Sequence, residues 1–508
     1  MTHNKHVSRR SFLAFIGTSA AALAAASTGL DPLLNKATAS AAQPNMGLAE
    51  AIPFPALQPQ TTDRLTAAAG YAIDTLAVPS GSVGAGSGHI GFWPTSERGR
   101  GLLWVSHKAG TPQVGDTGNA GGRGASVMGV QRSGDGAWKL DPKAPEARRL
   151  TSRDRIDLTG PVRGAQAVGG ASVVQGLWCN GSGGRTPWGT VLAGEHPLDV
   201  DAARAGIPTA AVGWLAEADP TDSRFSTRKH TALGRFAHGD IAAALAPDGR
   251  AVLYMCGEQV LFKYISRDVY DPSKGTANSV LLENGTLYAA DLGGGRWIEL
   301  AVEQVRDTLA DPAFRMPPGV NRRREELLAM LSEQADVLTH ARETALVLGA
   351  TQLEQAAGVA LHPTDGTLFV SQTGSILSGS GYGSILRLVE DGGDSAAIAF
   401  ESDLVLAGGR QAAFSSPGSI SFDAAGRLWI ATNMPADRLN QGAYAPFGNN
   451  ALYALTASGE TFAKAESFLC APGSAILSLP AFGPDGTVFA GVHNPDIAAS
   501  TIVAIRRM

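Results

Sequence analysis

A turn glycine followed by a short apolar run recurs along the chain at a nearly constant interval, and this repeat limits the folds open to it. The intervals are 60, 117, 60 and 60 residues between Gly189, Gly249, Gly366, Gly426 and Gly486. A sixth copy, at Gly99, lies upstream at a looser spacing. Glycine before alternating β-branched and aromatic residues favours a β-hairpin, because glycine tolerates the positive φ of a tight turn.

Repeat units of this length, with about four strands each, are typical of propeller blades, in which radial packing buries both faces of a small sheet. We therefore expect an all-β protein, a β-propeller of about six blades. The alternative is a β-sandwich with unrelated Asp-Gly turns, which the three equal intervals disfavour.

The pattern becomes helical between about residues 301 and 350, where Leu327, Leu331, Ala335 and Leu338 recur at a helical spacing. We expect a helical insertion there, within a single propeller that covers residues 71–508. Residues 42–70 contain four prolines and little periodicity, and we expect an extended N-terminal arm. The formal net charge of −5 gives no support for a nucleic-acid partner, which needs clustered lysines and arginines.

The first 41 residues are interpreted as a twin-arginine signal peptide. Arg9 and Arg10 precede an apolar run that is too short for a stable membrane anchor, and Ala39-Ser40-Ala41 supplies a small-residue cleavage pattern. The alternative is a chance Arg-Arg pair before an anchor. We expect the twin-arginine translocase as a partner during export, a bacterial periplasmic or secreted location, and no anchor in the mature protein, because no later stretch reaches about 18 apolar residues.

The chain has three cysteines, Cys179, Cys256 and Cys470, which are far apart and lack the paired spacings of a zinc site. Buried thiols are the simplest interpretation. One disulfide remains open as an alternative in an oxidising compartment.

The segment Asn180-Gly181-Ser182-Gly183-Gly184-Arg185-Thr186-Pro187-Trp188-Gly189-Thr190 resembles the Gly-Gly-x-Thr-Pro-Trp-Gly-Thr signature of PhoX-type alkaline phosphatases. The resemblance continues in order along nearly all of the mature chain, for example at residues 101–107, 232–238, 348–351 and 426–432. It implies a propeller exported by the twin-arginine route that hydrolyses phosphomonoesters with calcium and iron.

The chain departs from this family at positions that hold metal. Gly181 occupies the position of the family's metal-binding cysteine, and Cys179 lies two residues earlier. Glu195 and His196 occupy the positions of the family's paired glutamates. The other family acids and a phosphate-binding arginine are replaced at Lys108, Gly239, Gln355, Ala357, Gly418 and Ile476. Calcium and ferric ions need carboxylate oxygens as ligands. With these acids replaced, we expect that the family's metal cluster is absent from this chain.

Several side chains that carry chemistry remain in the matched segments near the expected mouth of the propeller. The candidate metal ligands are His107, Glu195, His196, His238 and Glu258, and the candidate catalytic residues are Glu195, His196 and Arg185, with Trp188 nearby. A His/Glu set could bind one transition metal. The alternative is that these histidines are structural.

We therefore expect a binding or structural protein of the cell envelope, a pseudoenzyme without a metal cofactor that takes a small-molecule or protein ligand at the mouth. The first alternative is an active phosphoric monoester hydrolase whose reduced or rebuilt site holds calcium, iron or a transition metal. The second is another propeller hydrolase, such as a sugar lactonase, because a fold alone does not determine function.

Overall fold

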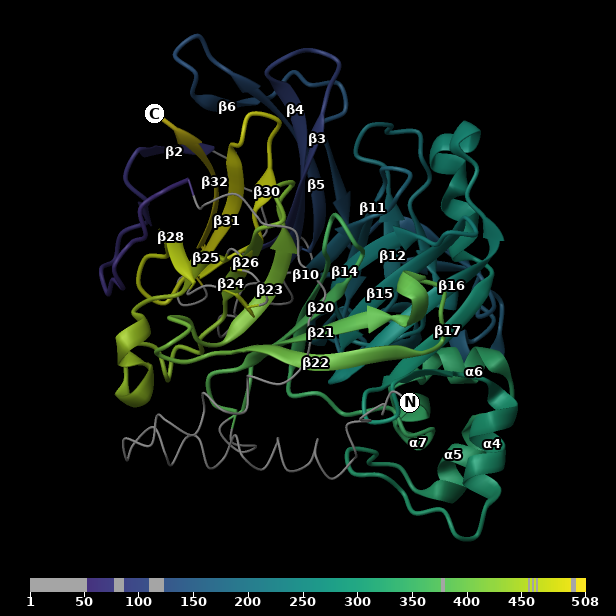
Figure 1. The fold of residues 1–508 in the computed structure, drawn as a ribbon. Coiled ribbons are helices and arrows are strands. Elements are labelled where there is room, and N and C mark those ends of the chain that lie inside the picture. The colour runs from purple at the N-terminus through teal and green to yellow at the C-terminus, as the bar shows by residue number, and fades with distance from the viewer. Residues whose placement is uncertain are drawn as a thin grey trace.

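The computed structural model describes residues 53–76, 86–108, 123–375, 380–455, 457–458, 461–462, 465–494 and 499–508. In these residues, six sheets of four to six strands form the blades of one propeller, which confirms the expected fold (Figure 1). The predicted signal peptide, with Arg9 and Arg10, lies outside the described residues. Among the described residues, no helix is both long and apolar enough to cross a membrane.

We number the blades in chain order and give their strands from the axis outward. Blade one contains β3 (Gly86–Pro94), β4 (Arg100–Lys108) and β5 (Gly124–Arg132), with β6 (Trp138–Asp141) and β7 (Arg148–Thr151) both paired to β5. Blade two contains β10 (Cys179–Arg185), β11 (Val191–Glu195), β12 (Leu215–Ala218), β13 (Arg228–His230), β8 (Arg155–Thr159) and β9 (Val173–Gln175). Blade three contains β14 (His238–Leu245), β15 (Arg250–Gly257), β16 (Val260–Val269), β17 (Gly285–Asp291) and β18 (Arg296–Glu299).

Blade four contains β19 (Ala356–Leu361), β20 (Leu368–Gln372), β21 (Ser384–Glu390) and β22 (Phe400–Ala407). Blade five contains β23 (Pro417–Phe422), β24 (Leu428–Thr432), β25 (Ala451–Leu455), β28 (Glu466–Cys470) and β1 (Thr66–Ala67). Blade six contains β29 (Ile476–Leu477) and β30 (Ala481–Phe482), both paired to β31 (Val488–Asn494), then β32 (Ala499–Arg507) and β2 (Tyr71–Leu76). A separate hairpin consists of β26 (Ala457–Ser458) and β27 (Thr461–Phe462).

The repeated glycines lie in the turn before the second strand of each blade, or before β31 in blade six. All six have positive φ: Gly99 77°, Gly189 91°, Gly249 87°, Gly366 70°, Gly426 74° and Gly486 77°. Each turn therefore uses the conformation that favours glycine, and each repeat corresponds to one blade. The long interval between the third and fourth glycines contains no further blade.

Four α-helices lie in that interval: α4 (Val302–Ala310), α5 (Arg324–Met330), α6 (Gln334–Thr339) and α7 (Ala341–Val347). Figure 1 shows them grouped at one edge of the propeller. Leu327 and Leu331 are fully buried, in the same core as Phe236 and Leu287 of the blade-three region. The insertion is therefore packed into the propeller rather than attached to its surface.

The N-terminal segment completes the last two blades. Thr66 pairs with Cys470 at the outer edge of blade five, and β2 pairs with β32 at the outer edge of blade six. Phe54 is 6% exposed, and its ring packs 4.8 Å from that of Phe468 between centroids. The described part of the expected arm therefore pairs and packs with blade five.

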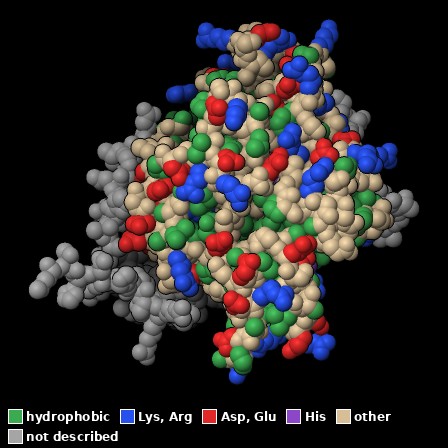
Figure 2. Space-filling view, turned by 90° about the vertical axis from the view of Figure 1, so that its right-hand side faces the viewer, with side chains coloured by type: hydrophobic (Ala, Val, Ile, Leu, Met, Phe, Trp, Pro, Cys, Tyr) green, Lys and Arg blue, Asp and Glu red, His purple; other side chains and the backbone are tan. Residues whose placement is uncertain are grey.

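Figure 2 shows acidic and basic side chains interspersed over one face of the molecule.

The three cysteines are buried thiols without a disulfide, on β10, β15 and β28 of three different blades. Burial, with help from the nearby Glu195 carboxylate, raises the pKa of Cys179 to about 12, so this thiol is not a nucleophile at neutral pH.

Candidate functional site

The inner strands of neighbouring blades lie side by side around the axis, and five of them begin with an irregularity in strand register. We call the end of the propeller at which the inner strands begin the mouth. His238, for example, is the first residue of β14 and pairs with Gly257, but the register shifts before Ile241. Such bulges redirect side chains near functional sites, and the mouth is where the sequence places the candidate residues.

Glycines bring the inner strands into backbone contact at the mouth. A Cβ atom on Gly88 would lie 2.1 Å from Cα of Gly181, and one on Gly239 would lie 2.7 Å from the carbonyl oxygen of Ala357. Gly181 itself has a φ of 94°, where any other residue is strained. The backbone has therefore closed over positions at which the resemblance places a cysteine and an acid.

Glu195, at the end of β11, is completely buried inside blade two. Its Oε1 accepts hydrogen bonds from the backbone N–H of Trp178 at 2.8 Å and from the Lys229 ammonium at 2.9 Å. Its Oε2 accepts from the N–H of Gly213 at 3.1 Å. Both oxygens of this candidate ligand are thus occupied by groups of the chain itself.

Glu258 lies in the turn between β15 and β16, beside the start of β14. Its Oε1 accepts the backbone N–H of Ala237 at 3.0 Å, and its Oε2 lies 3.6 Å from Nε of Arg342 on α7. This carboxylate therefore joins the mouth to the helical insertion.

The histidines at the mouth are in three different environments. Nε2 of His107 lies 2.8 Å from Ser126 Oγ, and burial together with Arg149 lowers the pKa of His107 to about 3. The His238 ring packs on Phe236 at 3.9 Å, and within the described part of the chain neither of its nitrogens has a hydrogen-bond partner. Burial lowers the pKa of His238 to about 3. Nδ1 of His196 accepts the N–H of Leu198 at 3.0 Å.

Arg185 does not belong to the mouth. It is the last residue of β10 and pairs with Val191, whereas Cys179, the first residue, pairs with Glu195. The six residue-to-residue steps between them place these two ends about 20 Å apart. The Arg185 guanidinium instead lies over the Trp93 ring, 5.1 Å from its centroid. The expectation of a shared site was wrong because the signature runs along an inner strand from one end of the propeller to the other.

The mouth residues do not fit the calcium and iron cluster that the resemblance implies. Among the described residues, no group of three His, Cys, Asp or Glu side chains could hold a metal ion. From residue 53 onward, the segments outside the description add only three such residues to the sequence: Asp116, Glu460 and Asp496. Hard cations need several carboxylate oxygens, and Glu195 and Glu258 are engaged by cationic and amide groups of the chain.

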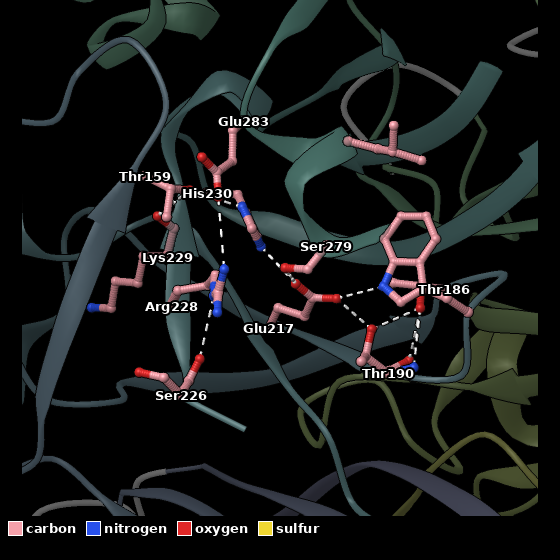
Figure 3. A network of polar contacts seen from close by, with 12 residues as sticks. Thr159, Thr186, Thr190, Glu217, Ser226, Arg228, Lys229, His230, Ser279 and Glu283 are labelled. Atoms are coloured by element: carbon pink, nitrogen blue, oxygen red, sulfur yellow. Dashed lines mark hydrogen bonds and ion pairs between the residues drawn. The ribbon is translucent and has the colours of Figure 1, made fainter. Parts of the chain in front are cut away.

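The signature motif has a structural partner that the sequence did not reveal, the buried carboxylate of Glu217 on β12 (Figure 3). Its Oε1 accepts hydrogen bonds from the Trp188 indole N–H at 2.7 Å and from the Thr190 hydroxyl. Its Oε2 lies 2.8 Å from Nε2 of His230 and accepts the hydroxyl of Ser279. Burial opposes ionisation of Glu217, but these hydrogen bonds outweigh it and hold the pKa of Glu217 below its usual value.

This network links three strands of blade two to the segment between β16 and β17 of blade three. Nδ1 of His230 also lies 2.9 Å from the hydroxyl of Thr159 on β8. Sequence reasoning missed Glu217, Lys229 and His230 because their partners are distant along the chain. One sequence signal could have found them: they are charged or titratable residues within short apolar strands that follow the signature.

Comparison with known proteins agrees with this architecture. A family model described as alkaline phosphatase PhoX matches residues 54–496. The solved structure of Pseudomonas fluorescens PhoX in complex with vanadate, a transition state analogue, matches with a TM-score of 0.73 and 24% identity, covering 89% of this chain and 98% of that chain.

Two further solved structures are much less similar to this chain. A glucose dehydrogenase has a TM-score of 0.33 and 13% identity over 78% of this chain and 86% of its own. A Trypanosoma rangeli sialidase has a TM-score of 0.37 and 8% identity over 86% of this chain and 58% of its own. No curated protein sequence matches the chain.

Proposed function

Since the chain belongs to the PhoX alkaline phosphatase family, we propose that it keeps the family's propeller but has lost its metal-dependent phosphatase site. It then acts as a binding protein of the cell envelope, with a small-molecule or protein ligand at the mouth. The proposal rests on the fold, on the family, and on the side chains present at the mouth.

The main support is the backbone contact between inner strands at the mouth. Gly239 lies where the resemblance places an acid, and a Cβ atom there would lie 2.7 Å from the carbonyl oxygen of Ala357. A ligand cluster needs space between the inner strands as well as acids, and this contact removes the space.

Phosphoryl transfer without such a cluster would lack its usual source of rate enhancement. Metal ions and arginines offset the charge that develops on the transferred group, and removing one preorganised donor commonly costs about 10²-fold in rate. The position that the resemblance gives to a phosphate-binding arginine is Gln355. Arg185 cannot replace it, because Arg185 lies at the other end of β10.

The test measures the metal content and the phosphatase activity of protein that has been purified after native export. We expect less than one iron and one calcium per chain, and weak or absent hydrolysis of p-nitrophenyl phosphate at alkaline pH. Brisk hydrolysis that is abolished by His196→Ala, but not by Arg224→Gln at an exposed site of the same blade, would instead establish a rebuilt site. That outcome would support the alternative of an active phosphomonoester hydrolase with a calcium, iron or transition-metal ion.

Export by the twin-arginine route is part of the same proposal, because this route carries proteins that are already folded. Replacing Arg9 and Arg10 by lysine should leave the precursor in the cytoplasm, whereas a variant with Lys5→Arg should be exported normally. Equal export of both variants would contradict the assignment to this route.

A further inference from the structure

Lys229, on β13, is a lysine buried completely inside blade two. Its ammonium nitrogen lies 2.9 Å from Oε1 of Glu195 and donates to the carbonyl oxygen of Ala211, also at 2.9 Å. These distances are those of charge-assisted hydrogen bonds and are longer than the 2.3–2.6 Å of calcium–oxygen contacts. Both oxygens are therefore engaged by an ammonium group at ordinary hydrogen-bond distances.

The position of Lys229 follows from strand alternation. Neighbouring residues of β13 point to opposite sides, so that His230 reaches Glu217 while Lys229 runs the other way (Figure 3). Glu195 also receives two backbone N–H donors, from Trp178 and Gly213, which stabilise negative charge on its carboxylate. The negative side of the site is therefore built by the backbone and does not depend on Lys229.

We propose that Glu195 and the Ala211 carbonyl form a binding site for a primary ammonium ion, which the native chain fills with its own Lys229 side chain. The site is in effect occupied by a tethered ligand. This inference goes beyond the proposed function, because an active enzyme could contain the same pair. It predicts that shortening Lys229 opens the site to an ammonium compound from solution.

Propylammonium is the appropriate probe. The change Lys229→Ala removes three carbons and the ammonium nitrogen, which is the size and charge of propylammonium. It also leaves the Glu195 carboxylate buried without its counter-charge, which is strongly destabilising. In sodium chloride, we expect this variant to have a lower melting temperature than the native protein. When propylammonium chloride replaces sodium chloride at equal ionic strength, the melting temperature of the variant should rise by about 2 °C or more.

Three controls separate a specific site from a general effect of the salt. Propan-1-ol has the size of the probe without its charge, and tetramethylammonium has the charge without N–H donors, so neither should raise the melting temperature of Lys229→Ala. Lys229→Met fills the space without the charge, so propylammonium should not stabilise it. The double variant Lys229→Ala, Glu195→Gln keeps the space but lacks the carboxylate, and it should not respond either.

A second buried lysine gives a further comparison. Lys263 pairs with Glu390 at 2.9 Å, but its ammonium lies 5.0 Å from the Trp297 ring centroid and 5.5 Å from that of Tyr254. Burial raises the pKa of Glu390, so this carboxyl should take up a proton when Lys263 is shortened. Lys263→Ala should therefore be recovered less by propylammonium than Lys229→Ala.

The proposal is overturned if propylammonium raises the melting temperature of Lys229→Ala no more than that of Lys229→Met. Should Lys229→Ala not fold in sodium chloride, its refolding yield is measured in place of the melting temperature. A higher yield in propylammonium than in tetramethylammonium chloride supports the site, and equal yields overturn it. Neither result depends on phosphatase activity, so failure here is distinguishable from failure of the proposed function.

Discussion

The Trp188 indole donates a hydrogen bond of 2.7 Å to the buried carboxylate of Glu217, so the central aromatic residue of the family signature is anchored inside blade two. Thr190, two residues later, donates to the same oxygen. The signature therefore has a structural role that is independent of catalysis. Its side chains therefore stabilise blade two whether or not the mouth is catalytic.

The first prediction concerns this hydrogen bond. Trp188→Phe should lower the free energy of unfolding by about 1.5–3 kcal/mol beyond the packing lost, because hydrogen bonds to charged groups are worth more than neutral ones. Trp178→Phe is the matched control, since its indole donates at 3.0 Å to the neutral carbonyl of Gln175. Urea unfolding of both variants tests the order, and an equal or larger loss for Trp178→Phe would contradict the anchoring role.

The second prediction concerns the closed mouth. A Cβ on Gly239 would lie 2.6 Å from Sγ of Cys256 and 2.7 Å from the Ala357 carbonyl oxygen, so Gly239→Ala must move the backbone of β14 or β19. We expect a loss of about 1–3 kcal/mol, as for other overpacked positions. Gly134→Ala, with nothing within 4 Å of the added Cβ, should change stability little. A neutral Gly239→Ala would show that the inner strands can separate.

The blades could be predicted from the sequence because each one depends on a local signal. Gly366 and Gly426 occupy turns whose positive φ is dictated by the hairpin itself, so their spacing reports the blade period without knowledge of distant contacts. The closure of the ring could not be predicted in this way. The pairing of Thr66 with Cys470 joins segments about 400 residues apart, and no local pattern in a two-residue strand specifies it.

The partners of the candidate site residues could not be predicted from the sequence either. Glu195 was expected at the mouth as a candidate metal ligand and catalytic residue. Its strand position is at that end, but its side chain pairs with Lys229 inside the blade. Lys229 reaches it only because β13 pairs with β12 in one particular register. The sequence suggests which acids of the family pattern are replaced, but it does not reveal that Glu195 is paired with a lysine of the same blade.

The third prediction concerns the N-terminal segment. Phe54 packs against Phe468, Trp429 and Tyr71, and Phe54→Ala should cost about 3–5 kcal/mol, as for other buried aromatic residues. Gln58→Ala, at an exposed position of the same segment, should cost little. Chemical unfolding measures both values. If Phe54→Ala were as stable as Gln58→Ala, the packing of Phe54 would contribute nothing to blade five.

The fourth prediction is a loss of stability in mild acid that arises at the mouth. His238 has its pKa lowered from 6.5 to about 3 by burial, so the folded protein keeps this ring neutral while the unfolded chain takes up a proton as the pH falls below 6.5. The unfolded state then binds more protons than the folded state, and stability must decrease with falling pH in this window. Each such histidine should cost about 2 kcal/mol between pH 7.5 and pH 5.

His238→Leu keeps a similar volume on Phe236 and removes the titrating group, so its unfolding free energy should fall by about 2 kcal/mol less than that of the native protein over the same interval. Part of the loss should remain, because burial and Arg149 also lower the pKa of His107 to about 3. The comparison stops at pH 5 because carboxylates with lowered pKa values, such as Asp365 at about 2, contribute at more acidic pH. Urea unfolding at the two pH values gives the difference directly. An identical loss in His238→Leu and the native protein would mean that the ring is protonated in the folded state, and that the mouth is open to water at His238.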